Sequence, residues 1–390
     1  MKTAPPGAEA GTTPANAEAP VPLLDLALAH RAIAEDLKRD FERVLASGQF
    51  ILGAEHDAFE RELAQATGLT HAIGLSSGTS AITLALQALG VGPGDEVILP
   101  AFTYFATASA VVHAGATPVF ADVEPRRFGL DSASVEARIG PRTKAILAVH
   151  LYGLACDLAP LTRLALTRGI PLLEDAAQAI GATDQGVPVG KADAGATLSF
   201  FPTKNLGALG DAGAFVTDRD DVARRVRLLS RQGDAGDYRH TAVGTNARLD
   251  ALQAAFLRTK LRHLRAWVAA RRDAAQTYRD ALAGTPVTLP EEPAGAVHTY
   301  HQFTIRASRR DALQAHLREH GIATRVYYPI PLHLQPAFAY LGLGPGAFPI
   351  SEKLTGEVIS LPLYPGITRE QIERVASSIR AFYAEDGVEG

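Results

Sequence analysis

Short, nearly all-apolar segments alternate with helix-length segments between residues 71 and 217, and this alternation constrains the fold more than any other feature of the chain. Strands without polar alternation are typical of a sheet that helices cover on both faces. The pattern therefore predicts an α/β protein with a mostly parallel sheet between helices. Seven segments have the strand pattern: His71–Leu75, Glu96–Leu99, Thr117–Ala121, Ala145–His150, Pro171–Leu173, Ala196–Phe201 and Gly213–Thr217.

Helix-length segments lie between the earlier strands, at Ser80–Leu89, Tyr104–His113 and Leu158–Thr167. Only a loop joins the last two strand segments, so we do not expect every connection to be helical. A further helix is predicted at Asp218–Arg231, because its apolar residues fall on one stripe and Asp218 is placed to cap it.

The second half of the chain predicts a smaller α/β domain. A helical pattern from Leu249 to Leu282 is longer than most globular helices, so we interpret it as one helix that joins two domains. We expect a large domain at residues 21–260 and a small C-terminal domain at 261–390. The predicted elements of the small domain are a strand near Val297–Arg306, a helix near Asp311–His320, a strand near Ile322–Tyr327, a loop at Pro329–Pro349 and a terminal helix near Arg369–Tyr383.

Residues 1–20 differ in composition from the rest of the chain. They are rich in Ala, Pro, Gly, Thr and Glu, and they show no apolar periodicity. Such a segment cannot bury a core, so it is predicted to be a disordered tail. It also lacks the continuous apolar stretch of a secretory signal, and no run in the chain approaches the roughly 18 apolar residues of a membrane span.

Charge and cysteine content exclude several classes of protein. The formal net charge is −4, from 38 Lys and Arg against 42 Asp and Glu, which gives no field for nucleic acid or an acidic membrane. The single cysteine, Cys156, excludes an internal disulfide and a cysteine-based zinc site. We therefore expect a cytoplasmic protein without a metal site.

Lys204 is the first residue with the chemistry of a catalytic group. It follows an apolar strand directly, beside Pro202, in the segment Leu198–Asn205. A partly desolvated lysine loses some of its preference for the charged form, so its amine becomes a usable nucleophile. A lone lysine in a loop is more often a surface residue, so the prediction needs further support.

Asp175 ends an apolar strand upstream of Lys204, at the edge where doubly wound sheets place their ligands. A carboxylate at such a place can pair with a protonated pyridine nitrogen, as in pyridoxal-phosphate (PLP) sites. Taken alone, Asp175 is more readily explained as the cap of the following helix.

A third element, Gly74–Ser80, lies between a strand and a helix. Its backbone N–H groups, with the hydroxyls of Ser77 and Thr79 beside Gly78, suit a phosphate at a helix N-terminus. The glycine fingerprints of dinucleotide and nucleotide loops are absent. Together the three elements supply a phosphate cradle, a ring-nitrogen partner and an aldehyde-binding amine, each at a strand end.

From about Pro22 to the C-terminus, the chain resembles the DegT/DnrJ/EryC1/StrS family of nucleotide-sugar aminotransferases, which have PLP fold type I. The motifs that carry the resemblance are Ser77-Gly78-Thr79-Ser80, Pro100-Ala101-Phe102-Thr103-Tyr104, Glu174-Asp175-Ala176-Ala177-Gln178, Ser199-Phe200-Phe201-Pro202-Thr203-Lys204-Asn205 and Gly244-Thr245-Asn246-Ala247-Arg248.

The resemblance implies a role for each of these residues. Lys204 would hold PLP as a Schiff base and later move the proton between substrate and cofactor, and Asp175 would pair with the pyridine nitrogen. Gln178 would lie near the ring hydroxyl, and Tyr104 would stack on the ring. The phosphate would be held by Ser77, Gly78, Thr79 and Ser199, and by Asn246 of the neighbouring subunit of a homodimer.

Two details refine this expectation. Some dehydratase-like members of the family have histidine in place of the lysine, so Lys204 favours transamination. The segment Ser230–Gly233 lacks the histidine that members often have in an Arg-Asn-His-Gly motif, so we assign it no catalytic role.

The reaction implied is a ping-pong exchange between L-glutamate and a nucleotide-linked ketosugar. The segment Tyr327–Pro336 resembles that of 3-ketosugar aminotransferases, which favours a dTDP-3-keto-6-deoxyhexose as acceptor. A UDP-linked 3-keto-hexuronic acid and a 4-keto nucleotide sugar are the alternatives. Tyr328 and His333 could line the sugar pocket or simply pack the loop.

Two hypotheses of other classes remain open. A PLP-binding regulator without turnover would not need the intact set of Lys204, Asp175 and Gln178. A dehydrogenase on a doubly wound sheet would need a glycine fingerprint that the chain lacks.

Overall fold

Seven strands form the central sheet of the computed structural model, which describes residues 19–385. Their order is β1-β9-β8-β5-β4-β2-β3. Strands β3, β2, β4, β5 and β8 are parallel, whereas β9 runs antiparallel to both β8 and β1. Their bounds are β1 His71–Leu75, β2 Glu96–Pro100, β3 Thr117–Ala121, β4 Thr143–Val149, β5 Leu172–Asp175, β8 Ala196–Ser199 and β9 Gly213–Thr217. The predicted α/β class and mostly parallel sheet are confirmed.

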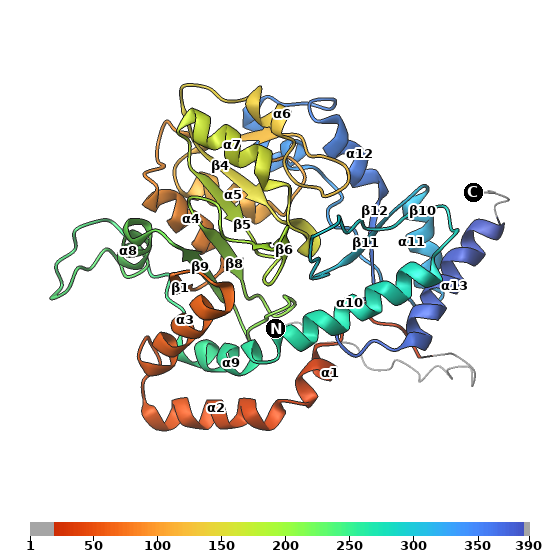
Figure 1. The fold of residues 1–390 in the computed structure, drawn as a ribbon, viewed down its shortest axis with the longest axis horizontal. Coiled ribbons are helices and arrows are strands. Elements are labelled where there is room, and N and C mark those ends of the chain that lie inside the picture. The colour runs from red at the N-terminus through yellow and green to blue at the C-terminus, as the bar shows by residue number, and fades with distance from the viewer. Residues whose placement is uncertain (1–18, 386–390) are drawn as a thin grey trace, which may run out of the picture.

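Helices cover both faces of this sheet, which explains why its strands are apolar throughout (Figure 1). In β4, Ala145 and Leu147 pack on one face, while Ile146 and Ala148 pack on the other. One face is covered by α4 (Gly78–Ala88), α5 (Phe105–His113) and α8 (Asp220–Leu229). The opposite face is covered by α3 (Ala54–Thr67), α7 (Leu158–Arg168) and α9 (Ala251–Leu261).

A second, three-stranded sheet has its own apolar core. Its order is β10-β11-β12, and it packs with α10 (Leu264–Ala281), α11 (Arg310–Glu319) and α13 (Arg369–Glu385). The strands are β10 Val287–Thr288, β11 Phe303–Ala307 and β12 Val358–Leu361. Part of the C-terminal region leaves this core, because Leu332, Phe338 and Phe348 pack in the cluster of the large sheet. The predicted domain boundary at residue 260 stays a prediction.

The remaining elements are short or lie at the edges of the two sheets. They are α1 Leu26–Arg31, α2 Ala34–Ser47, α6 Ser132–Glu136, α12 Pro349–Glu357, the hairpin strands β6 Thr183–Asp184 and β7 Val187–Pro188, and the 3₁₀ helices η1 Leu151–Gly153, η2 Leu332–Leu334 and η3 Pro336–Leu341. Of these, η1 bears on the functional site, and η2 contains His333, which was predicted to line it.

The single long helix predicted at Leu249–Leu282 was wrong. The chain turns at Arg262–His263 and forms α9 and α10 instead. The reason is that the two halves bury different faces. Leu257 packs with the large sheet, whereas Tyr278 packs with the small one.

Two smaller predictions also need correction, and two elements were missed. Asp218 does not cap α8, because its carboxylate accepts hydrogen bonds from Thr70 and pairs with Lys191. Residues 322–327 form no strand; only isolated bridges join Ile322 to Val21 and Arg325 to Ser360. Helix α12 and strand β12 were not predicted.

The N-terminal segment enters the described part of the chain at Ala19. Most of the predicted tail, residues 1–18, lies outside the described residues. Val21 is buried, and its backbone bonds to Gly321 and Ala323, so the chain is fixed from this point onward. Within residues 19–385, no helix is long and apolar enough to cross a membrane.

Candidate active site

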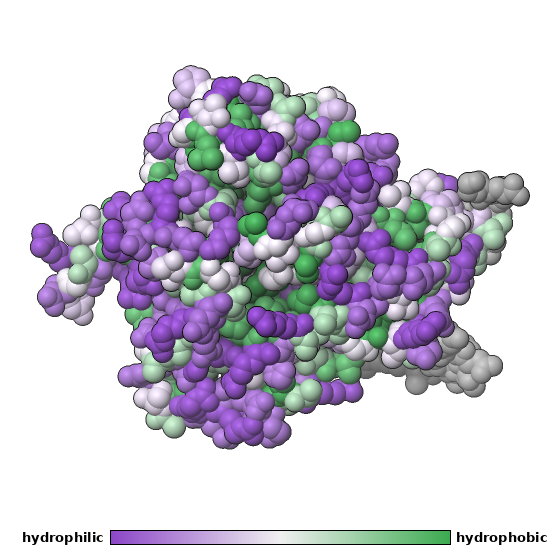
Figure 2. Space-filling view, viewed as in Figure 1, coloured by the Kyte–Doolittle hydropathy of each residue, from purple (hydrophilic) through white to green (hydrophobic). Residues whose placement is uncertain are grey.

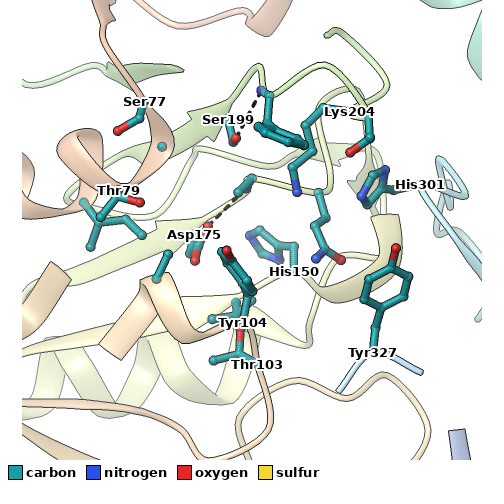
Figure 3. A pocket seen from close by; sticks show the side chains of 18 of the residues that line it. Ser77, Thr79, Thr103, Tyr104, His150, Asp175, Ser199, Lys204, His301 and Tyr327 are labelled. Atoms are coloured by element: carbon teal, nitrogen blue, oxygen red, sulfur yellow. Dashed lines mark hydrogen bonds between the residues drawn. The ribbon is translucent and has the colours of Figure 1, made fainter. Parts of the chain in front are cut away.

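A cavity of about 550 Å³ lies at the carboxyl ends of β4, β5 and β8. Figure 2 shows the hollowed face between the two sheets, where apolar residues reach the surface. The cavity brings together nine residues predicted from the sequence: Ser77, Gly78, Thr79, Tyr104, Asp175, Gln178, Ser199, Lys204 and Tyr328. Figure 3 shows Ser77 and Thr79 on one side of it, and Lys204 and His301 on the other.

The phosphate-cradle prediction corresponds to the N-terminus of α4. Ser77 caps this helix by accepting a hydrogen bond from the backbone N–H of Ser80 at 3.0 Å. Gly78 has to be glycine, since a Cβ there would lie 2.8 Å from Cβ of Ser199. The first residues of this eleven-residue helix and Ser199 line the cavity together, so the N-terminus of the helix lies at the cavity, an arrangement that suits a phosphate.

Asp175 is buried at the end of β5, and its carboxylate is held from two directions. Thr107 donates its hydroxyl to Oδ2 at 2.8 Å, and the Ala177 N–H donates to Oδ1 at 3.1 Å. Burial raises the pKa of the Asp175 carboxyl, while these hydrogen bonds and the charge of Lys204 oppose the rise. A cationic ring nitrogen would therefore be a favourable partner for this carboxylate.

Lys204 follows β8 in a tight turn, in which its N–H donates to the Phe201 carbonyl at 2.8 Å. Burial lowers the pKa of its ammonium to about 8, and the nearby Asp175 charge opposes the fall. Near pH 8, a substantial fraction of the molecules therefore carry Lys204 as a neutral amine. The neutral amine is the form that acts as a nucleophile.

Gln178 and Tyr328 close one side of the cavity together. Gln178 Oε1 accepts the Tyr152 N–H at 2.7 Å, so its amide nitrogen points away and donates to the Tyr328 hydroxyl at 3.0 Å. The ring of Tyr104 lies 5.6 Å from that of Tyr328 and is about half exposed. Tyr104 therefore presents an aromatic face at the cavity rather than packing in the core.

Sequence reasoning missed several residues of the cavity wall: Thr103, His150, His301, Gln302, Arg325 and Tyr327. His150 had a usable signal, because it is a polar residue at the carboxyl end of an apolar strand, as Asp175 is. Its Nδ1 accepts the Cys156 N–H and its Nε2 lies 2.7 Å from the buried Glu174 carboxylate, so Nε2 carries the proton.

Residues 299–302 come from the small-sheet side and are joined to η1 by backbone contacts. Thr299 N–H donates to the Gly153 carbonyl at 2.8 Å, and Gln302 N–H donates to the Tyr152 carbonyl at 3.2 Å. Gly153 has φ +105°, and a Cβ there would lie 2.8 Å from the His301 nitrogen. Only glycine permits this approach.

Two predicted residues lie outside the cavity. His333 is buried in η2, where Nε2 lies 3.1 Å from Glu352 and the ring packs on Phe348. It does not line the cavity, because the turn after Pro331 directs it into the protein. Asn246 is exposed and accepts a hydrogen bond from Arg248, so within one subunit it does not reach the cavity either.

The fold and the site define a PLP-dependent aminotransferase of fold type I. The DegT/DnrJ/EryC1/StrS aminotransferase family model matches residues 31–380, and the chain belongs to this family.

The chain is 48% identical to the erythromycin biosynthesis sensory transduction protein EryC1 of Saccharopolyspora erythraea, over 93% of this chain and 99% of that protein. It is 45% identical to a UDP-N-acetyl-3-dehydro-α-D-glucosamine 3-aminotransferase of Acidithiobacillus ferrooxidans, over 92% and 97%. It is 43% identical to a dTDP-3-amino-3,4,6-trideoxy-α-D-glucose transaminase of Streptomyces venezuelae, over 93% and 97%.

Among solved structures, DesV of S. venezuelae, crystallised with a ketimine intermediate, superposes with a TM-score of 0.92. It is 43% identical, and the match covers 94% of this chain and 99% of DesV. Together, these similarities show a PLP-dependent sugar aminotransferase and leave its substrate undetermined.

The residues present fit PLP. The cavity volume is within the usual range for cofactor sites, roughly 300–1,000 Å³. The open N-terminus of α4 suits the phosphate, Asp175 suits the ring nitrogen, and the Lys204 amine suits the aldehyde. When bound, PLP supplies the electron sink that stabilises negative charge on the substrate carbon.

Proposed function

We propose that this enzyme transfers the amino group of L-glutamate to a dTDP-linked 3-keto-6-deoxyhexose and forms a nucleotide amino sugar. The observation that carries the choice of acceptor is the segment Tyr327–Pro336, whose first two residues line the cavity. The dTDP-sugar transaminase relative supports the choice of nucleotide.

The chain's own residues divide the work of this reaction. Lys204 takes a proton from the substrate carbon as a neutral amine and returns it as an ammonium. Asp175 keeps the ring nitrogen protonated, and Thr107 keeps Asp175 in place. The amide of Gln178 is oriented by Tyr152, so it offers a donor beside the site of reaction.

The principal alternative acceptors are a UDP-linked 3-keto-hexuronic acid and a 4-keto nucleotide sugar. The relative that acts on a UDP-linked 3-dehydro sugar favours the UDP alternative. A spectrophotometric screen separates all three. Enzyme converted to the amine form with glutamate is mixed with each ketosugar, and return of the aldehyde-form absorbance identifies the acceptor. Reaction with 4-keto sugars alone would overturn the inference from the Tyr327–Pro336 segment.

We also propose that the enzyme is a homodimer in which Asn246 of one subunit completes the phosphate site of the other. Asn246 lies outside the cavity of its own chain, in a segment whose exposed residues include Tyr238 and Val243. A second copy is the occupant that would cover the exposed apolar residues and give the amide nitrogen of Asn246 an acceptor, since its oxygen already accepts from Arg248.

A non-catalytic PLP-binding regulator is the alternative of another class. The name of the EryC1 relative suggests signalling, but Lys204, Asp175 and Gln178 all line the cavity here, and Thr107 and the Ala177 N–H hold the Asp175 carboxylate in place. Conversion of the cofactor by glutamate alone separates the two functions, because a regulator would leave its spectrum unchanged. A cytoplasmic location is part of the proposal and rests on the free, buried Cys156.

A further inference from the structure

A side cavity of about 140 Å³ opens on the small-sheet side, and Thr203, the residue before Lys204, forms part of its wall. It shares Thr203, His301, Gln302 and Tyr327 with the main cavity. The rest of its wall is mostly apolar: Leu23, Leu24, Ser360, Leu361 and Leu363. The residues of the proposed reaction leave this junction unused, although it adjoins the reacting amine.

His301 and Gln302 each have one buried atom without a hydrogen-bond partner among residues 19–385. These atoms are Nδ1 of His301 and Oε1 of Gln302. An unpaired buried acceptor costs less than an unpaired buried donor, so the His301 proton belongs on Nε2. Both residues line the two cavities, and each therefore turns an uncommitted N–H donor, Nε2 in both cases, toward the junction.

Two basic side chains, Lys204 in its protonated form and Arg271, lie near His301, and the Asp175 carboxylate of the main cavity opposes the charge of Lys204. Burial first, then the charges of Lys204 and Arg271, keep the pKa of His301 well below its usual value. The Arg271 guanidinium is buried and binds the carbonyls of Tyr300, His301 and Leu363; within the described chain it has no carboxylate partner. No acidic residue lines the side cavity.

Uncommitted donors in a positive field attract an anionic acceptor. A sugar hydroxyl would gain little from the field, whereas a carboxylate gains from both the donors and the charges. A further arginine in the wall of the junction, in addition to Arg271, would leave a second buried charge without a carboxylate partner when the neutral sugar ring enters. Neutral donors avoid that cost, which suits a site that receives two different substrates in turn.

We propose that His301 and Gln302 are the anchor for a carboxylate of the amino donor. The proposal rests on the function proposed above, in which glutamate is that donor. The anchor would hold the donor against the small sheet with its amino group directed at the cofactor, beside Lys204.

Gln302→Glu provides the sharpest test, because it keeps the shape of the side chain and adds a charge that repels a carboxylate. Gln302→Met removes the donor without adding charge, and Gln65→Glu places the same charge on the exposed face of α3 as a control. The glutamate half-reaction of each holoenzyme is followed by its absorbance. Binding of maleate, an unreactive dicarboxylate, is measured by calorimetry.

We expect Gln302→Glu to raise the glutamate KM and weaken maleate binding by at least about tenfold. Gln302→Met should raise the glutamate KM and weaken maleate binding about fivefold each. Gln65→Glu should match the wild type in both measurements. The ketosugar half-reaction, started from enzyme loaded with pyridoxamine phosphate, should change less than about threefold in every variant.

Unchanged glutamate and maleate constants in both Gln302 variants would overturn the anchor. A loss of rate confined to the ketosugar half-reaction would also overturn the anchor, and it would indicate that the junction binds the sugar. If Gln302→Glu does not load cofactor, the test relies on maleate binding to Gln302→Met: weaker binding supports the anchor, and unchanged binding overturns it. A wild-type enzyme that glutamate does not convert would overturn the donor itself, which separates failure of the proposed function from failure of the anchor.

Discussion

The amide nitrogen of Gln178 donates to the hydroxyl of Tyr328 at 3.0 Å, and this bond joins residues 150 positions apart across the cavity. Because Gln178 is oriented by the Tyr152 N–H, the Tyr328 hydroxyl accepts and keeps its own proton free to donate. The Tyr327–Pro336 segment is thus connected to the loop that follows Asp175.

Tyr328→Phe removes this acceptor and the free donor while preserving the ring against Tyr104. We expect cofactor retention, with about a tenfold loss of kcat/KM for the ketosugar, the usual effect of one neutral hydrogen bond. Stopped-flow absorbance of the ketosugar half-reaction measures it. An unchanged kcat/KM in the ketosugar half-reaction would show that the Tyr328 hydroxyl does not contact the substrate.

Asp175→Asn should retain PLP but lose about 100-fold or more of turnover, since a neutral amide does not keep the ring nitrogen protonated. Thr107→Val, which deletes the 2.8 Å bond to the carboxylate, should cost only about tenfold. Cofactor content and kcat are measured together. Near-normal turnover of Asp175→Asn would show that another group fills the role.

The lowered pKa of Lys204 predicts how cofactor loading depends on pH. Only the neutral amine attacks the aldehyde, and its pKa is about 8, so the rate of PLP uptake by apoenzyme should rise tenfold per pH unit below 8 and level off above it. Asp175→Asn removes the charge that opposes the fall, so its midpoint should lie at lower pH. A plateau reached only near the ordinary pKa of lysine would contradict the burial of this amine.

The N-terminus can be shortened only to a defined point. Deleting residues 1–18 should leave cofactor-loaded enzyme with its melting temperature unchanged, because their composition cannot bury a core. Deletion through residue 24 removes the buried Val21 and its bonds to Gly321 and Ala323, and should cost about 1.5–3 kcal/mol from the valine alone. Calorimetric melting of the two truncations compares them. Loss of cofactor in the shorter deletion would contradict the prediction.

The proposed shared site is tested by mixing Lys204→Ala subunits with Asn246→Asp subunits. Asn246→Asp should weaken phosphate binding by like-charge repulsion, on the order of 1–3 kcal/mol. In a mixed dimer one site would carry both lesions and the other neither, so activity should exceed that of either parent. With mixed dimers verified by mass spectrometry, no recovery would mean that Asn246 serves its own chain.

The sequence predicts best those features that depend on residues adjacent in the chain, such as the bounds of strands and short motifs. Strands β1, β3 and β9 match their predicted bounds, because each is an apolar run between turn residues. Lys204, Asp175 and Gly78 were found because each lies in a short motif at a strand end. The loop between β8 and β9 favours their antiparallel pairing, whereas the pairing of β9 with β1 joins segments far apart in the chain and is not encoded in the local pattern.

The failures share a physical cause, since they depend on what a residue meets in space. The turn between α9 and α10 follows from two cores on different sides of one helical pattern. His333 is a residue type that often lines pockets, and it lies in the Tyr327–Pro336 segment, but its ring is directed toward Glu352. His301 and Gln302 have no motif of their own, and only their position beside Lys204 distinguishes them.

The approach of Gly153 to residues 299–302 has a consequence for how this site can be redesigned. The two backbones meet there without room for a methyl group, so the wall that carries His301 cannot slide relative to β4. New specificity therefore has to come from exchanging side chains on a fixed frame rather than from widening the entrance. A mutant library that randomises positions 153, 302 and 325 should yield altered donors and acceptors through changes at Gln302 and Arg325, while every active clone retains glycine at position 153.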